Sequence, residues 1–177
     1  AHPVSVLASG AHLFRAFMNV DQLPWLADHV VQGAIVLPGA AYLEMALHAG
    51  AQVMGGEPLV SEVVIGQALA LPADSQLEVQ VALTPRGQGR MHWQIASSPP
   101  NRGSWRVHVS GLLSPPLQEE ARTLDVAALR ERLRPKQEAE QTYEKFHSMG
   151  LMLGPALQGL RELYPGDGEA LGRIELP

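Results

Sequence analysis

Residues 39–53 read GAAYLEMALHAGAQV and carry the clearest helix signal of the chain. Pro38 precedes the segment and two glycines at 55–56 follow it, which is typical of a helix that begins and ends there. In its middle only Glu44 and, weakly, His48 are polar. Because apolar residues lie on nearly every side, we expect a helix buried all round, with His48 as a hydrogen-bonded core histidine.

Strand patterns flank this helix in the sequence. Strands are expected over residues 12–20, 58–71 (broken at Gly66), 76–84, 90–97 and 104–113. In the last three, apolar residues alternate with polar ones, so that Trp93, Trp105 and Val107 would face the core. His92 and His108 would then lie on the solvated faces. One buried helix with an antiparallel sheet predicts the α+β class.

The remaining segments are less regular. Residues 21–38 show no period, although Trp25 looks buried, and residues 114–124 read as a linker. The C-terminal part predicts helices over 125–134 and 138–149, a loop running into a strand over 150–163, and a last strand over 169–176.

Composition excludes several classes of protein. Of the 177 residues 46% are apolar and 18% charged, against roughly 25% charged in an average domain, so the chain is not intrinsically disordered. A net charge of −5 and scattered arginines argue against a nucleic-acid binder. The absence of cysteine excludes disulfides and favours the cytoplasm, and no apolar run is long enough for a membrane span. The start at Ala1 indicates a piece of a longer protein.

One histidine stands in a suggestive setting. His29 opens the stretch HVVQGAIVLP, in which Gly33 and Pro38 follow, and the helix then begins at Gly39. A desolvated neutral imidazole can act as a general base, and a free amide at a helix start can hold a carbonyl oxygen that gains charge. Gly33 would let the backbone approach closely. The alternative is a loop histidine that caps a turn, with Pro38 as an ordinary helix start.

The other histidines do not suggest a metal site. None of the seven shows H-x-H, H-x-x-x-H or H-E-x-x-H spacing, and no cysteine is present. We therefore expect no metal.

The stretch from His29 to Pro38 resembles the H-x-x-x-G-x-x-x-x-P signature of the dehydratase domains of modular polyketide synthases. The opening His2-Pro3, the flanking PWLADH and LPGAAYLEMAL, and VHVSGLL at 107–113 are similar to the same family. The segment from Tyr143 to Leu160 resembles the family's Y-x-x-x-x-x-x-G-x-x-Y-G-P-x-F motif. The resemblance covers nearly the whole chain.

This resemblance implies a double hotdog, in which each α+β unit wraps a curved antiparallel sheet round a central helix. The first hotdog would occupy residues 1–113, a linker with connecting helices 114–149, and the start of a truncated second hotdog 150–177. The family dehydrates a 3-hydroxyacyl thioester to a 2-enoyl thioester, as a hydro-lyase. His29 would take the C2 proton, and the Gly39 amide would hold the thioester carbonyl.

The resemblance also implies the rest of the site. Gly33, Pro38, Leu153 and Pro155 would belong to its substrate-binding part. An Asp of the second hotdog, within a D-x-x-x-Q/H motif, would protonate the departing hydroxyl. None of the five Asp residues of the chain is assigned to that motif.

Three departures from the family pattern leave other functions open, and the first is that the chain stops at Pro177 without the acid half of the site. Leu153 stands where the family has a tyrosine, and Leu157 where it has a phenylalanine. The chain could therefore be a double-bond isomerase, a pyran-forming cyclase or an inactive remnant on the same fold. A single hotdog that pairs with a second chain and only binds acyl groups is a further alternative.

The resemblance implies partners but no bound cofactor. The substrate would be presented on the phosphopantetheine of an acyl carrier protein, beside neighbouring synthase domains, in a cytoplasmic homodimer with no nucleic acid or membrane. Arg130, Arg132 and Arg134 could meet an acidic carrier protein, although an exposed helix face is the favoured explanation. Trp25 and Tyr42 could line an acyl tunnel, although core packing is favoured.

Overall fold

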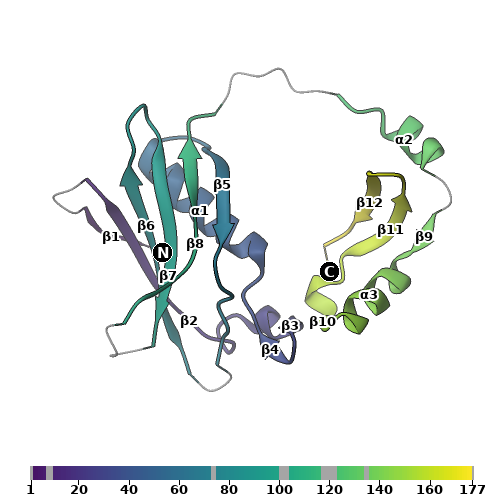
Figure 1. Ribbon diagram of the computed structural model, residues 1–177, viewed down its shortest axis with the longest axis horizontal. Coiled ribbons are helices and arrows are strands. Elements are labelled where there is room, and N and C mark those ends of the chain that lie inside the picture. Colours follow the sequence, from purple (N-terminus) through teal and green to yellow (C-terminus); the bar gives the residue numbers. More distant parts are fainter. Residues whose placement is uncertain are drawn as a thin grey trace. The chain divides into compact units, whose positions relative to one another are not determined.

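The computed structural model describes residues 2–6, 10–72, 75–99, 104–116, 123–133 and 136–176 (Figure 1). The chain divides into two compact units. Unit 1 comprises residues 1–24 and 36–118, and unit 2 comprises residues 25–35 and 119–177. The short segment that contains His29 thus belongs to the same unit as the C-terminal part of the chain. The division into two hotdogs at residues 113 and 150 stays a prediction.

Unit 1 is built on one six-stranded antiparallel sheet, in the order β1-β2-β6-β7-β8-β5 (Figure 1). Its strands are β1 (His2–Val6), β2 (His12–Met18), β5 (Leu59–Ile65), β6 (Leu77–Pro85), β7 (Met91–Ser98) and β8 (Arg106–Ser114). Five of these confirm the predicted strands, and β1 was not predicted. The alternation of β6 and β7 is confirmed, since their inward side chains are buried: Leu77, Val79, Val81, Leu83, Met91, Trp93 and Ile95.

The predicted helix is confirmed as α1 (Gly39–Met54), which contacts β5, β6, β7 and β8. It begins after Pro38 and ends at Gly55, whose φ of 74° is the left-handed conformation that closes many helices. Its buried face carries Tyr42, Ala46 and Ala49. The class is α+β, as the sequence predicted.

The prediction that α1 is buried all round is wrong in this chain. Leu43, Glu44, His48 and Gln52 are exposed, and they recur at helical spacing along one stripe. The sheet of unit 1 covers the opposite face. His48 is therefore no core histidine, and its Nε2 lies 2.8 Å from the Gln52 side-chain amide nitrogen.

A β-bulge in β8 corrects the predicted facing of its first residues. One extra residue, His108, is inserted between the residues that pair with Ile95 and Ala96. A bulge reverses which side chains face inward on one side of it. Trp105 and Val107, predicted to face the core, are accordingly exposed, whereas His108, predicted to be solvated, is only 4% exposed.

The buried His108 joins three segments of unit 1. Its Nε2 lies 2.8 Å from the hydroxyl oxygen of Ser97 on β7. Its carbonyl oxygen accepts hydrogen bonds from the amides of Gly66 (2.9 Å) and Gln67 (3.3 Å), directly after β5 ends. The predicted break at Gly66 is therefore confirmed and is fixed by the bulge.

Unit 2 contains two small antiparallel sheets with the orders β10-β3-β4 and β12-β11-β9. Their strands are β3 (His29–Val31), β4 (Ala34–Ile35), β9 (Gln137–Glu138), β10 (Leu151–Leu153), β11 (Leu160–Pro165) and β12 (Ala170–Ile174). The helices are α2 (Val126–Arg132) and α3 (Ala139–Ser148), with 3-10 turns η1 (Pro24–Asp28) and η2 (Pro155–Leu157).

These elements confirm the two predicted helices and the last strand. The predicted aperiodic segment instead contains β3 and β4, which are too short to show a period. Trp25, predicted to be buried, is 37% exposed. Of the predicted linker, residues 117–122 lie outside the described residues, and its first residue still belongs to β8.

Candidate functional site

Four of the six residues proposed for the site lie in unit 2, and they surround β3. The strand runs from His29 to Val31, and a two-residue turn leads directly into β4. The turn residues Gln32 and Gly33 have φ values of 51° and 82°, as in the type I′ turn that joins tightly paired strands. The positive φ explains why glycine stands at position 33. Close approach of another part of the backbone does not explain it, since a Cβ at this position would meet nothing within 4 Å.

The second motif of the sequence pairs with the first. β10 runs antiparallel to β3 and places Leu153 opposite His29. The neighbouring pair is hydrogen-bonded, because the Gly154 amide donates to the Asp28 carbonyl oxygen at 2.8 Å. Hydrogen-bonded and non-hydrogen-bonded pairs alternate in antiparallel ladders, and side chains are closer in the latter. His29 and Leu153 therefore form a close cross-strand pair.

The face of this small sheet that carries His29 is otherwise apolar. Side chains alternate between the two faces along a strand. Val31, Leu151 and Leu153 consequently share the face of His29, and all four side chains are half-buried. The replacement of the family tyrosine by Leu153 thus alters the residue directly opposite the imidazole.

Asp28 is the residue that the sequence reasoning missed. Besides its carbonyl contact, its carboxylate Oδ2 accepts a hydrogen bond of 2.7 Å from the Ala156 amide in η2. A Cβ at Gly154 would overlap with the Asp28 side chain, so only glycine fits there without a shift. Asp28 and Gln32 have the D-x-x-x-Q spacing. The prediction that no Asp of the chain lies in such a spacing is therefore wrong. This pair precedes the predicted second hotdog, in which the family resemblance places its Asp.

The segment after Leu153 is held by further polar contacts. Pro155 opens η2 and is exposed. The half-buried Gln158 side-chain amide donates to the Leu153 carbonyl oxygen at 2.7 Å. The Tyr143 hydroxyl accepts a hydrogen bond of 2.8 Å from the Leu160 amide, which ties α3 to the start of β11.

The remaining two residues proposed for the site, Pro38 and Gly39, lie in unit 1. Pro38 is the N-cap of α1 and offers no side-chain acceptor, while the Ala41 amide donates to its carbonyl oxygen at 3.0 Å. Among the described residues, the Gly39 amide has no hydrogen-bond acceptor. The first amides of a helix lack partners within the helix and point outward along its axis. The Gly39 N–H can therefore donate to a carbonyl oxygen.

The start of α1 is fixed by a segment that follows β5. The Leu37 amide donates to the Leu69 carbonyl oxygen at 2.9 Å. The Leu69 amide in turn donates to the Tyr42 hydroxyl at 3.1 Å. Burial raises the pKa of Tyr42, against the opposing effect of that hydrogen bond. Tyr42 is almost fully buried, which confirms packing as its role.

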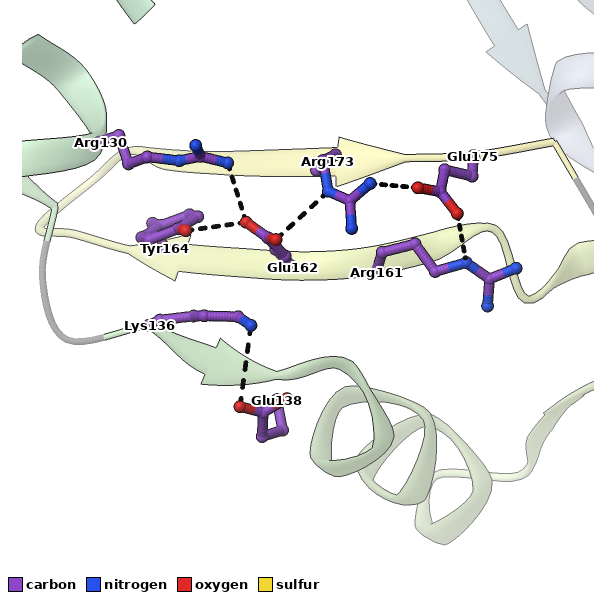
Figure 2. A network of polar contacts seen from close by, with 8 residues as sticks. All are labelled: Arg130, Lys136, Glu138, Arg161, Glu162, Tyr164, Arg173 and Glu175. Carbon is purple, nitrogen blue, oxygen red and sulfur yellow. Dashed lines mark hydrogen bonds and ion pairs between the residues drawn. The ribbon is translucent and has the colours of Figure 1, made fainter. Parts of the chain in front are cut away.

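The arginines of α2 are engaged within unit 2. Figure 2 shows Arg130 donating to Glu162, at 2.9 Å, while Arg173 contacts the same carboxylate at 3.3 Å. Arg132 pairs with Glu169 on the turn before β12. The idea that Arg130 and Arg132 form a free basic surface is therefore not supported. Arg134 lies outside the described residues.

No group of three or more histidine, aspartate or glutamate side chains is arranged to hold a metal ion in the part of the chain that the structure describes. In that same part, no helix is long and apolar enough to cross a membrane.

Comparisons with known families identify this arrangement. Residues 1–98 match the polyketide synthase dehydratase domain, and residues 119–177 match the polyketide synthase dehydratase N-terminal domain. The chain is 33% identical over 172 residues to polyketide synthase GfsB of Streptomyces halstedii. It is 30% identical over 178 residues to the pikromycin synthase component PikAII of Streptomyces venezuelae. These matches cover 93% and 98% of the chain but only 3% and 5% of the relatives.

Solved dehydratase domains share the fold. The CurK dehydratase, solved as an inactive Asp-to-Asn mutant, matches with a TM-score of 0.88 at 25% identity. The CurJ dehydratase, solved as an inactive His-to-Phe mutant, matches equally well. The matches cover 98% and 99% of this chain and 61% of each solved chain. The predicted α+β hotdog fold is thereby confirmed.

Proposed function

Because the chain belongs to the dehydratase domains of polyketide synthases, we propose that it removes water from a 3-hydroxyacyl thioester within a synthase module. The product is a 2-enoyl thioester. The pairing of His29 with Leu153 carries this proposal, because it brings the two motifs of the family together around one imidazole.

Two groups of the chain have a role in the proposed chemistry. His29 Nε2 or Nδ1 takes the proton from C2, and the electron pair of that C–H bond forms the C2=C3 double bond. The Gly39 N–H donates to the thioester carbonyl oxygen, which gains negative charge as the proton leaves. The C3–O bond breaks, and a proton delivered to the hydroxyl completes the water.

The acid that delivers this proton lies outside the residues of this site. Inactivation of a CurK dehydratase by an Asp-to-Asn change and of a CurJ dehydratase by a His-to-Phe change supports a His–Asp mechanism for the family. Asp28 does not fit the acid role. It is the last residue of η1, before β3 begins, and its carboxylate Oδ2 already accepts a hydrogen bond from the Ala156 amide at 2.7 Å.

The family also supports partners for this reaction. The relatives are components of modular synthases, so an acyl carrier protein would present the substrate on its phosphopantetheine, beside neighbouring catalytic domains. No bound cofactor is needed, because proton transfer alone balances the reaction. A homodimer in the cytoplasm completes this proposal.

One observation favours a second function. Leu153 removes the family's phenol from the position opposite His29. The shift of an existing double bond releases no hydroxyl and needs no group to protonate one, so a site that has lost a phenol but keeps its base makes an isomerase the alternative.

The test replaces His29 in the polypeptide in which the chain occurs. We expect His29→Ala to abolish conversion of a 3-hydroxyacyl carrier substrate, followed by mass spectrometry of the carrier-bound chain. The matched control is His48→Ala, an exposed histidine of α1 outside the proposed site. Supplying a 2-enoyl substrate in parallel separates the functions, since an isomerase would move its double bond without loss of water. Unchanged turnover by the His29 variant would remove this residue from the mechanism.

A further inference from the structure

We propose that Asp28 is a positioning residue for His29, and that the second motif of the chain serves to hold the proposed base. This inference rests on the proposed role of His29. It concerns a residue next to the base that touches no reacting atom.

Asp28 uses both its main chain and its side chain to bind the second motif. Its carbonyl oxygen accepts from the Gly154 amide at 2.8 Å, and its Oδ2 accepts from the Ala156 amide at 2.7 Å. In the sequence, Gly154 lies 126 positions and Ala156 lies 128 positions after Asp28. The residue that directly precedes His29 is therefore fixed at two atoms, and the backbone of His29 is fixed with it.

The fit between the two motifs leaves no room for a side chain at position 154. The backbone of Gly154 has an ordinary φ of −81°, which any residue adopts. A Cβ there would nevertheless come within 2.8 Å of the Asp28 Cβ and would overlap the carboxylate as well. Glycine is needed at this position because Asp28 occupies the space.

The other end of β3 is held in a comparable way. The Gln32 amide donates to the Gly150 carbonyl oxygen at 2.8 Å. Gly150 has a φ of 85°, and a Cβ there would lie 2.8 Å from the Gln32 side-chain nitrogen. His29 thus lies on a three-residue strand that is clamped at both ends, and only the Asp28 end uses a carboxylate.

A loosened strand would misplace the imidazole without changing its chemistry. Displacements near 1 Å cost roughly a hundredfold in rate, because catalysis needs the base in line with the proton. We therefore expect Asp28→Ala to lower kcat about ten- to a hundredfold, with KM nearly unchanged. Asp28→Asn should retain most of kcat, because its side-chain oxygen can still accept from the Ala156 amide.

A matched control separates positioning from general stability. Asp125 lies in the same unit, and its carboxylate also accepts a backbone amide, that of Ala128 at 3.0 Å, as the N-cap of α2. Asp125→Ala makes the same chemical change to the same kind of hydrogen bond. It should lower thermal stability but leave kcat within about twofold.

A second pair of variants tests the fit directly. Gly154→Ala should lower kcat strongly, because the new Cβ displaces Asp28. The double variant Asp28→Gly with Gly154→Ala removes the overlapping atoms. The kcat of the double variant should therefore be higher than the value obtained by multiplying the fold losses of Asp28→Gly alone and Gly154→Ala alone, because the two residues are coupled neighbours.

The proposal and the proposed function fail in different ways. If His29→Ala is inactive but Asp28→Ala keeps full kcat, the positioning role is wrong and the function stands. If His29→Ala remains active, the function fails first. Should Asp28→Ala not fold, Asp28→Asn and the double variant decide: an Asn variant without kcat, or a double variant with no more activity than the product of the singles, would overturn the positioning role.

Discussion

Unit 1 and unit 2 are stabilised by different kinds of contact. The largest fully buried side chains of unit 1 come from its sheet, from α1 and from the segment after β5: Phe14, Tyr42, Leu69, Leu83, Trp93, Ile95, Val109 and Leu113. Among the described residues of unit 2, only Leu26, Leu133, Ala139 and Tyr164 are buried apolar side chains. In their place, unit 2 has hydrogen bonds and ion pairs between segments far apart in the sequence.

The polar contacts of unit 2 centre on one carboxylate. Figure 2 shows Glu162 on β11 bound by Arg130 of α2, Arg173 of β12 and the hydroxyl of Tyr164. The side chains of Arg130 and Arg173 are 47% exposed and that of Glu162 is 19% exposed, so water and salt screen these ion pairs in part and each contributes little individually. Unit 1 is therefore held mainly by apolar burial, whereas unit 2 has fewer buried apolar side chains and more polar contacts between segments far apart in the sequence.

The largest expected effect is therefore a core substitution in unit 1. Trp93 is fully buried, and its ring lies against Gly111. Trp93→Ala should lower the free energy of unfolding by about 3–5 kcal/mol, since it removes apolar burial and leaves a cavity. Chemical denaturation measures this loss.

The control for Trp93 is a second tryptophan of the same unit. Trp105 is 37% exposed and contacts Arg15, whose guanidinium lies 5.5 Å from the ring centre. Trp105→Ala should cost about 0.5–1 kcal/mol, as expected for an exposed cation–π contact. Equal losses for the two variants would contradict the view that the core of unit 1 dominates its stability.

The same contrast explains what could be predicted from the sequence. In β6 and β7 the period of two is set by burial, so Val79 and Trp93 could be placed on the core face without a structure. The pattern failed at His108, because a bulge shifts the period by one residue and leaves no compositional sign. The helix α1 looks buried all round in the sequence, because the sequence does not show which side of the helix the sheet of unit 1 covers.

The candidate site was only partly predictable for a related reason. His29 and Leu153 could be singled out through the family resemblance, but their pairing could not, because β3 and β10 have three residues each. Asp28 could not be distinguished from a solvated carboxylate, since its partner at Ala156 lies 128 positions away. Contacts between distant residues carry no local periodicity.

The next effect is the response of unit 1 to acid. Burial lowers the pKa of His108 from its ordinary value of 6.5, although the backbone near Gln67 and Ala68 opposes this. The unfolded chain then binds a proton more readily than the folded one, so stability is full above pH 6.5 and is lost as pH falls toward the folded pKa. Unit 1 should lose hydrogen-exchange protection as pH falls below 6.5.

Removal of the titrating group tests this assignment. His108→Asn should flatten the pH dependence of unit 1, because asparagine does not gain a proton. The exposed His48→Asn serves as the control and should leave that dependence intact. A pH dependence that survives in the His108 variant would show that another group is responsible.

The smallest expected effect is the loss of stability of unit 2 in acid, through the Glu162 carboxylate. The Tyr164 hydrogen bond, Arg173, Lys136 and Arg130 lower the pKa of Glu162 below its ordinary 4.5, outweighing its partial desolvation. A depressed carboxyl pKa means that the stabilisation is present above pH 4.5 and is lost as pH falls through the folded value. Acid should thus weaken unit 2 at a lower pH than it weakens unit 1.

Glu162→Gln should slightly lower the protection of unit 2 against hydrogen exchange at neutral pH and leave unit 1 unchanged. Because salt screens exposed charges, added salt should reduce the difference between the variant and the wild type. Glu138→Gln is the matched control and should change even less, since among the described residues the Glu138 carboxylate forms one ion pair, with Lys136 at 3.8 Å. A salt-independent loss in the Glu162 variant would instead point to the Tyr164 hydrogen bond, and the contrast between the two units would then be one of hydrogen bonding more than of charge.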